Sequence, residues 1–265
     1  MPGPLRRQLT GWGYDFITFL DRGEPGLTLM NYGYAAPDDS PSTTPYDPLH
    51  CRQQLYHHLT EAVPLEGQRM LEVGSGRGGG ASYVMTTFSP ASLVGVDLSP
   101  RAVRFCRRRY AGRPGLTFQR GRAEALPFPD ASFDAVLNVE SSHGYARMDH
   151  FLREVTRVLR PGGRFLWTDF RLKDRMPGLR EALKEAGLVM ERELLITERV
   201  VAALDQDEAY KDELIERKVP RWLQRPARVF GGMRGTTIYE SFKDGGREYW
   251  SFILRAPSLE HPSRD

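Results

Sequence analysis

The stretch RMLEVGSGRGGG, residues 69–80, decides the fold. Its first five residues form a short apolar run that meets a glycine cluster, which indicates a buried strand entering a turn. Glycines allow the backbone to turn sharply and to approach a ligand closely, because no Cβ stands in the way. A helix is expected to follow at 81–88. The stretch therefore predicts a strand, a ligand-binding loop and a helix in succession.

The same alternation continues along the chain. Further apolar runs predict strands at 92–97, 133–139, 163–170 and 189–197. Ser99 followed by Pro100 is typical of a helix start, Asp149 is expected to cap a later helix, and Gly187 closes a helix at 179–186. Strands separated by helices predict an α/β fold with a mostly parallel sheet that is covered on both faces. In such sheets ligands bind at the carboxyl ends of the strands.

Composition excludes several other classes of protein. The chain has 265 residues, 40% of them hydrophobic and 27% charged, with a formal net charge of +3. Its two cysteines rule out a disulfide scaffold and fit a reducing compartment, so we expect a cytoplasmic protein. We expect no signal peptide and no stable membrane insertion, since no apolar run approaches the roughly 20 residues that a span needs. The arginines between 101 and 122 are interpreted as a solvated face, and no nucleic-acid partner is expected.

Amino-acid composition and hydrophobic pattern divide the chain into four regions. Residues 1–48 are rich in glycine, proline and aromatic side chains and are expected to form an irregular N-terminal flap. Residues 49–197 carry the alternating strands and helices and are expected to form the cofactor-binding core. Residues 198–245 mix apolar with many charged side chains, which predicts amphipathic helices forming a cap. Residues 246–265 hold the last strand and the C-terminal tail.

Two acidic residues sharpen the interpretation of the glycine loop. Gly74, Gly76 and Gly79 also satisfy the dinucleotide-binding pattern, which leaves an NAD-dependent oxidoreductase open. Asp97 ends the next strand, where a carboxylate accepts the hydroxyls of a ribose. Glu72 precedes the loop, where a carboxylate is unfavourable beside an anionic pyrophosphate. The same carboxylate attracts a ligand that carries an ammonium and a sulfonium group.

At this point the segments LEVGSGRGG, VGVDLS, AEALPFPDASFDAVLNVE and FLREVTRVLRPGGRFL together resemble the class I S-adenosylmethionine-dependent methyltransferases. The segments VESSHGY, RKVPRWLQ and GTTIYESFKDGGREYWSFIL are similar in particular to the branch that contains the mycobacterial phthiotriolone/phenolphthiotriolone dimycocerosate O-methyltransferases. The resemblance to the sterol C-methyltransferases is more distant. The resemblance to the class I methyltransferases implies a Rossmann-like, seven-stranded sheet whose last strand, at 248–254, is antiparallel. It also implies S-adenosyl-L-methionine as cofactor and S-adenosyl-L-homocysteine as product.

The resemblance further implies which residues hold the cofactor. Arg122 departs from the family, which usually has an acid there, so either Glu124 or a backbone carbonyl accepts from the adenine amino group. The other interpretation of Arg122 is a solvated surface arginine. Tyr32 belongs to an aromatic group with Trp12 and Tyr14 that either closes over the site or packs as core. The residues expected to contact the cofactor are Tyr32, Glu72, Gly74, Ser75, Gly76, Asp97, Leu98, Ala123, Glu124 and Asn138.

A hydroxyl acceptor has to lose its proton, so O-methylation needs a base near the transferred methyl group. His143 follows a strand that ends at the cleft, and histidine exchanges protons near neutral pH, so we expect His143 to be the general base. The alternative is that His143 merely packs. Glu140 is expected either to orient His143 or to bind a substrate hydroxyl. The residues expected to shape the acceptor site are Tyr34, Tyr145 and Trp222, each with core or interface packing as the alternative.

We therefore expect a methyltransferase that O-methylates a hydrophobic small molecule, such as a hydroxylated polyketide or lipid-like natural product. No metal is expected, because the histidines and acids lack metal-ligand spacing. The chain is expected to be a monomer or a homodimer. C-methylation of a sterol-like or aromatic carbon stays open, because it also uses a base. A non-catalytic cofactor-binding protein is the remaining class.

Overall fold

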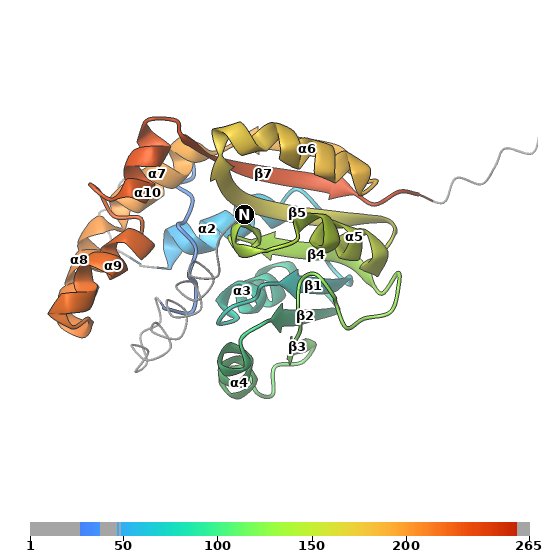
Figure 1. Ribbon diagram of the computed structural model, residues 1–265. Coiled ribbons are helices and arrows are strands. Elements are labelled where there is room, and N and C mark those ends of the chain that lie inside the picture. The colour runs from blue at the N-terminus through green and yellow to red at the C-terminus, as the bar shows by residue number, and fades with distance from the viewer. Residues whose placement is uncertain (1–26, 38–46, 48, 259–265) are drawn as a thin grey trace, which may run out of the picture.

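The computed structural model describes residues 27–37, 47 and 49–258 (Figure 1). Trp12 and Tyr14 lie outside the described residues. The strands are β1 Arg69–Val73, β2 Ser92–Asp97, β3 Leu116–Arg120, β4 Phe133–Val139, β5 Leu159–Leu172, β6 Val189–Leu195 and β7 Arg247–Arg255. The described helices of the core are α2 His50–Thr60, α3 Gly79–Phe88, α4 Pro100–Arg109, α5 Met148–Val158 and α6 Met176–Glu185. They are followed by α7 Thr197–Gln206, α8 Glu208–Lys218, α9 Arg221–Phe230 and α10 Thr237–Lys243.

The strands form one seven-stranded sheet in the order β3-β2-β1-β4-β5-β7-β6. β1 pairs in parallel with β2 and β4, β2 with β3, and β4 with β5, whereas β7 runs antiparallel to both β5 and β6. This confirms the mostly parallel, Rossmann-like sheet and the antiparallel last strand. β3 was not expected as a strand, because only its residues Leu116 and Phe118 are both apolar and buried.

Local signals in the sequence explain most helix starts. Ser99 caps α4, where its hydroxyl accepts from the amide of Ala102 at 3.3 Å, and Pro100 takes the first helical position. The expectation for Asp149 was wrong. Arg147 occupies the N-cap position of α5, and Asp149 lies in the first turn, where it pairs with Arg147 and Arg153. A carboxylate in the first turn still complements the positive end of the helix dipole.

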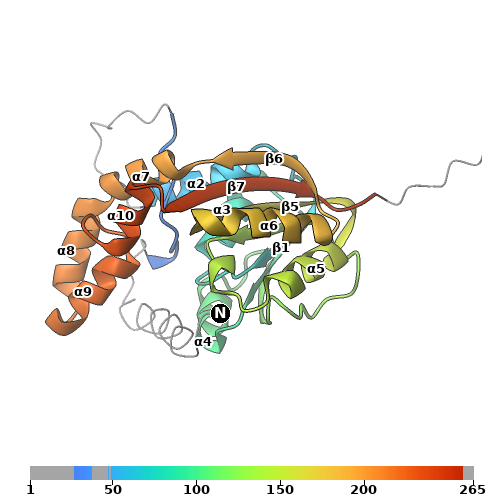
Figure 2. The same cartoon turned by 45° about the horizontal axis from the view of Figure 1, so that its top comes forward.

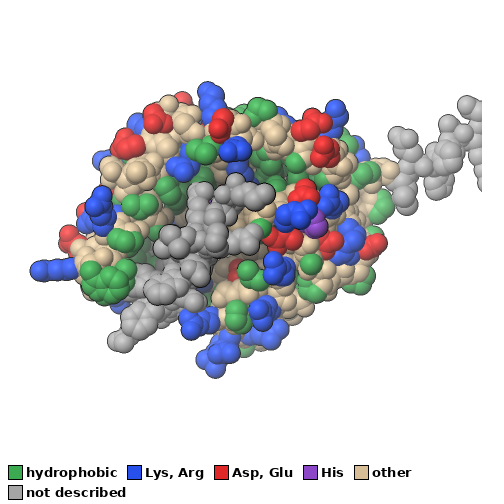
Figure 3. Space-filling model, viewed as in Figure 1, with side chains coloured by type: hydrophobic (Ala, Val, Ile, Leu, Met, Phe, Trp, Pro, Cys, Tyr) green, Lys and Arg blue, Asp and Glu red, His purple; other side chains and the backbone are tan. Residues whose placement is uncertain are grey.

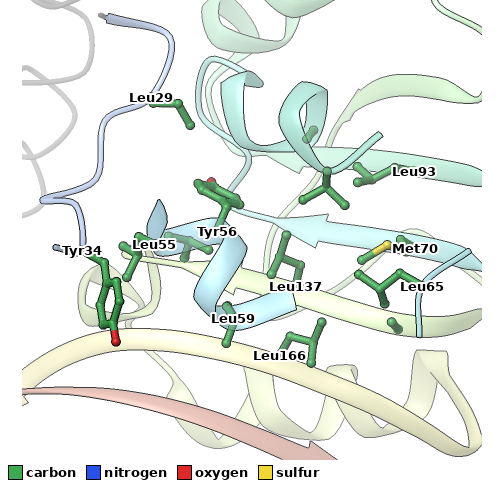
Figure 4. Close-up of a cluster of buried hydrophobic side chains, with 14 of the residues drawn as sticks. Leu29, Tyr34, Leu55, Tyr56, Leu59, Leu65, Met70, Leu93, Leu137 and Leu166 are labelled. Atoms are coloured by element: carbon green, nitrogen blue, oxygen red, sulfur yellow. The ribbon is translucent and has the colours of Figure 1, made fainter. Parts of the chain in front are cut away.

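Two apolar layers cover the sheet. On one face α2 packs Leu55 and Leu59 against Leu137 of β4 and Leu166 of β5, as Figure 4 shows. The other face carries α5 and α6, with side chains such as Phe151 of α5 buried in a separate cluster. Truncating one such buried leucine to alanine typically costs about 2–5 kcal/mol, so these layers fix the sheet that carries the site.

The polar region between the last two strands forms the four helices α7–α10. Because β6 runs parallel to β5 while β7 runs antiparallel, these helices leave and re-enter the sheet at the edge where the parallel strands end. Figures 1 and 2 show them gathered at that end of the molecule. None of the helices in the described ranges is long and apolar enough to cross a membrane.

Candidate active site

The glycine loop turns where β1 ends. The amides of Gly74 and Ser75 both donate to the carbonyl of Val96, at 2.8 and 3.0 Å, which holds the loop against the end of β2. Gly74 has φ +77°, and a Cβ there would meet the side chain of Ser141 and lie 2.9 Å from the hydroxyl of Tyr145. Glycine is therefore required at position 74 by both backbone conformation and space.

The carboxyl group of Glu72 is buried beside this loop. Its Oε1 accepts from the hydroxyl of Tyr56 at 2.7 Å, whereas its Oε2 is buried with no hydrogen-bond partner among the described residues. Burial raises the pKa of Glu72 to about 7, although the hydrogen bond from Tyr56 lowers it in part. A buried carboxylate oxygen without a donor is a site for a cation such as an ammonium group.

Asp97 is held with its carboxylate aimed at the same edge. Its Oδ2 accepts from the amide of Gly76 at 2.9 Å and its Oδ1 from the amide of Ser99 at 2.8 Å. Each oxygen keeps a second acceptor position, so the fixed carboxylate can take a pair of hydroxyls. The neighbouring Leu98 is 59% exposed, which leaves an apolar side chain free to pack on a flat ring.

The segment after β3 agrees with one of the two interpretations of Arg122. Arg122 is exposed and bridges to Ala125 through the backbone, so it is a surface arginine. Ala123 is buried in the core cluster under α5. Glu124 is half-buried, and its Oε1 accepts from the amide of Ala146 at 3.3 Å. Glu124 thus lies beside the connection that follows β4.

A small pocket opens between the glycine loop and the segment 28–31. Its walls are Thr28, Leu29, Met30, Asn31, Tyr56, Gly74, Ser75, Gly76, Arg77, Gly80, Val139 and Glu140. The next residue, Tyr32, is tied to the pocket because its amide donates to Oε1 of Glu140 at 2.7 Å. The described part of the N-terminal region therefore lies over the cofactor loop, with Tyr32 at its edge.

Asn138 and Tyr145 form the floor behind the loop. The Asn138 amide nitrogen lies 2.8 Å from the carbonyl of Val73, 2.7 Å from Ser141 Oγ and 3.1 Å from the Tyr145 hydroxyl. Asn138 is completely buried, and its Oδ1 has no partner among the described residues. The Tyr145 ring packs edge-on against Phe151, so its packing role is the one that the structure displays.

The imidazole of His143 is held by a carboxylate from the neighbouring strand. His143 Nδ1 lies 2.8 Å from Oδ1 of Asp169, and the backbone amide of His143 donates to Oδ2 at 2.9 Å. Asp169 is 1% exposed in its side chain, whereas that of His143 is 31% exposed. Burial alone would raise the pKa of Asp169, but the charges of His143 and Arg171 and the hydrogen bonds from His143 and Ser142 hold it well below its usual range.

Glu140 does not orient His143, contrary to one of the two roles expected for it. It has the positive φ of +44°, and its Oε1 accepts from the Tyr32 amide and, at 2.6 Å, from the hydroxyl of Tyr249. Burial raises the pKa of Glu140 to about 7. The acid that orients His143 is Asp169 of β5, for which the sequence suggested no role. Glu140 instead ties the N-terminal segment to the sheet.

Two residues expected at the acceptor site lie elsewhere. Tyr34 is 9% exposed and stacks on His58 with ring centroids 4.4 Å apart, which is the packing alternative. Trp222 is 78% exposed on α9, so the structure places it on the surface and not in a pocket. The aromatic wall beside His143 is Phe170, which stacks on the imidazole at 4.4 Å and on the Tyr32 ring at 5.7 Å.

Sequence reasoning missed three residues of this site: Tyr56, Asp169 and Tyr249. Tyr56 and Tyr249 are the donors to the two buried glutamates, and each comes from an element distant in sequence. Only Asp169 carried a usable signal, because it lies near the end of the strand predicted at 163–170, where functional side chains of such sheets gather.

A glycine loop with a buried acid beside it, a fixed acid after β2 and a histidine held by an acid together define an enzyme that uses a nucleoside cofactor. The family described as a methyltransferase domain matches residues 71–167. A "Fatty-acid O-methyltransferase" from Mycolicibacterium smegmatis is 42% identical over 88% of this chain and 84% of that protein. A "Phthiotriol/phenolphthiotriol dimycocerosates methyltransferase" from Mycobacterium tuberculosis is 37% identical over 86% of this chain and 84% of that protein. The chain belongs to this family of S-adenosylmethionine-dependent methyltransferases.

Solved structures show the same fold at low sequence identity. A "putative sarcosine dimethylglycine methyltransferase from Galdieria sulphuraria" has a TM-score of 0.75 and 18% identity, and covers 92% of this chain and 98% of that chain. The "[4+2]-Cyclase SpnF" has a TM-score of 0.72 and 22% identity, and covers 94% and 95% of the two chains. The family assignment removes the NAD-dependent alternative. The unpartnered Oε2 of Glu72 and the doubly held Asp97 fit the amino group and the ribose of S-adenosylmethionine.

Proposed function

We propose that the protein O-methylates a hydroxyl group on a hydrophobic, lipid-like acceptor, with His143 as general base. The observation that carries this proposal is the pairing of His143 Nδ1 with the buried Asp169, which leaves Nε2 available to accept a proton. The names of the relatives, a fatty-acid and a dimycocerosates methyltransferase, support a lipid-like acceptor. A lone histidine would be weak support; a histidine held by a buried carboxylate is the recurring arrangement of a base and its orienting group.

Glu72 and Asp97 are the residues of this chain that would hold S-adenosylmethionine. When bound, the cofactor supplies an activated methyl group on a sulfonium. Glu72 offers its free Oε2 to the cationic end, and Asp97 offers its two fixed oxygens to the ribose hydroxyls. Tyr32, Leu98 and Asn138 remain proposed contacts of the cofactor. Holding the reacting groups in line can contribute roughly 7–11 kcal/mol to the barrier reduction.

His143 acts on the acceptor. Its Nε2 takes the proton of the hydroxyl, which makes the acceptor oxygen nucleophilic. Asp169 keeps the proton on Nδ1 by accepting from it, and its negative charge stabilises the imidazolium that forms. The Phe170 ring against the imidazole limits access of water to one side of the base. Glu140 keeps Tyr32 over this region through the Tyr32 amide.

The test is an acceptor screen with methyl-labelled S-adenosylmethionine and detection by mass spectrometry. The panel pairs each long-chain alcohol with the fatty acid of equal chain length, and adds phenols and sterol-like alkenes. We expect labelled ethers from alcohols, and His143→Ala should lower their formation by roughly 10²–10⁴-fold without changing cofactor affinity. A carboxylate needs no base, so labelled esters without any labelled ether would contradict both the proposed hydroxyl acceptor and the proposed role of His143. Label on carbon would assign C-methylation instead.

A further inference from the structure

The outer face of α9 is one part of the described surface to which the proposed chemistry gives no role. On its inner face Leu223 and Ala227 pack against the cluster of Ile215, Val219 and Met233. The face pointing away carries Trp222, which is 78% exposed. Tryptophan is rarely left this exposed, because its large ring gains most from burial. An exposed tryptophan on an otherwise packed helix indicates a surface that meets a partner.

Positive charge surrounds this tryptophan. Arg221 precedes it and Arg225 follows three positions later, and both are exposed. Helical spacing places all three side chains on one face. The sequence from Arg217 to Tyr239 contains no Asp or Glu, so α9 supplies no acid of its own.

The acids of α8 that lie close to α9 already interact with another arginine. Arg228, on the side of α9 toward α8, pairs with Asp212 and lies 3.9 Å from Glu216. Arg221 and Arg225 form no ion pair within the described part of the chain. The outer face therefore presents two uncompensated cations beside an indole. Figure 3 shows hydrophobic and Lys or Arg side chains exposed together over the α8–α9 end.

We propose that the outer face of α9, defined by Arg221, Trp222 and Arg225, docks the protein on a lipid surface with anionic headgroups. A short helix that combines basic side chains with an exposed tryptophan is typical of binding in the plane of a membrane interface. The arginines meet the anionic headgroups, and the indole enters the boundary between headgroups and acyl chains. Such docking is peripheral and needs no membrane-spanning helix.

Docking on a lipid surface would bring the enzyme to its substrate, and this part of the inference rests on the proposed function, in which the acceptor is lipid-like. The helices α7–α10 lie at the edge of the sheet where the strands end, which is also the edge that carries the glycine loop and His143. A protein held by α9 would keep the site close to a lipid surface in which a poorly dissolved acceptor resides.

The test measures co-sedimentation of the full-length protein with vesicles of 70% phosphatidylcholine and 30% phosphatidylglycerol, without any acceptor. Each arginine beside an anionic surface contributes a factor of about five in affinity, so Arg221→Gln with Arg225→Gln should weaken binding about 25-fold. Trp222→Ser should weaken it at least about tenfold, whereas Trp222→Phe should retain most of it. Cofactor binding by calorimetry should be unchanged in all three variants.

A matched charge control lies on α4, where Arg104 and Arg108 are also exposed. Arg104→Gln with Arg108→Gln removes the same charge and should leave vesicle binding within about threefold of the wild type. The inference is overturned if the wild type does not bind these vesicles, or if the α4 variant loses as much binding as the α9 variant. It is equally overturned if Trp222→Ser only converts a dimer into a monomer in light scattering.

Activity assays separate this inference from the proposed function. Trp222→Ser should lower methyl transfer to an acceptor held in anionic vesicles and leave transfer to a short-chain, dissolved acceptor unchanged. If no acceptor is methylated by the wild type while vesicle binding still depends on Trp222, the proposed function fails and the docking surface stands.

Discussion

Replacing Asp169 by asparagine exchanges one oxygen for nitrogen, and this small change tests the proposed base, His143, together with the group that orients it. The carboxylate accepts from His143 Nδ1 at 2.8 Å and the Phe170 amide at 2.8 Å through Oδ1, and from the His143 amide and Ser142 Oγ through Oδ2. Arg171 lies 3.2 Å from Oδ2. An amide has a single oxygen, so its NH₂ group must replace one of these two acceptor positions.

Either orientation of the amide has a cost that the contacts define. With NH₂ in the place of Oδ1, it faces the Phe170 amide, donor against donor, and it forces the proton of His143 onto Nε2, which can then no longer accept. With NH₂ in the place of Oδ2, it faces the His143 amide and the Arg171 cation. One buried unsatisfied donor costs about 1–3 kcal/mol. Loss of the correct tautomer and of the charge that stabilises imidazolium should lower kcat roughly 10²–10⁴-fold.

The assay is single-turnover transfer of labelled methyl to the alcohol acceptor found in the screen, with cofactor affinity measured by calorimetry. Asp169→Asn should lower the rate of transfer and leave the cofactor Kd within about threefold, and the loss should be smaller with a phenol, whose proton is more acidic. Asp130→Asn is the matched control, because Asp130 is an exposed partner of Arg157 and should leave the rate unchanged. Wild-type rates with Asp169→Asn on an aliphatic alcohol would refute the reasoning.

Three further perturbations address the cofactor loop and its cover. Burial raises the pKa of Glu72 to about 7, so this carboxyl group becomes charged as pH rises through 7, and calorimetry should show S-adenosylmethionine affinity increasing from pH 6 to 7.5. Glu72→Gln should weaken binding and remove this pH dependence. If the variant keeps the same pH dependence, another group is responsible for it. Gly74→Ala should lower the free energy of unfolding by about 2–5 kcal/mol, from φ +77° together with overpacking, whereas Gly178→Ala, which meets open space, should be near neutral in thermal denaturation. Glu140→Ala removes the acceptor of the Tyr32 amide, so hydrogen exchange at Tyr32 should accelerate at least about tenfold, and unchanged protection there would show that the segment is held by other contacts.

The parallel strands were predictable because burial on both faces leaves an almost continuous apolar run. β1, β2 and β4 begin and end where the sequence placed them. β3 lies at the edge of the sheet, and its sequence LTFQR alternates between buried and exposed positions amid arginines, so hydrophobic runs do not reveal it. In α9, Trp222 and Leu223 are adjacent apolar residues, and the sequence does not say which of the two faces the core. That is why Trp222 was expected inside and lies outside.

The loop and its acids were predictable because their spacing along the chain sets their place at the strand ends. The pairing of His143 with Asp169 was not, because it depends on the register of β4 with β5, in which Val139 lies opposite Thr168. That register brings Asp169 beside the residues that follow β4. A sequence gives the strand order only through a resemblance, and it gives no side-chain direction across neighbouring strands. The hydrogen bond from the Tyr32 amide to Glu140 could not be predicted for the same reason, because it joins residues 108 positions apart in the sequence.

The pKa values of two buried carboxyl groups, Glu140 directly after β4 and Asp169 in the neighbouring β5, are shifted in opposite directions by their surroundings. Asp169 faces the cationic groups of His143 and Arg171, so its pKa lies well below the usual range and it stays charged. The hydrogen-bond donors to Glu140 among the described residues are neutral, the Tyr249 hydroxyl and a backbone amide, so burial dominates and the pKa of Glu140 rises to about 7. A permanently charged acid suits the stabilisation of an imidazolium, and an acid near neutrality suits the holding of a neutral segment. Separated pKa values of this kind assign the two acids different roles, although Glu140 belongs to the connection after β4 and Asp169 binds His143 of the same connection.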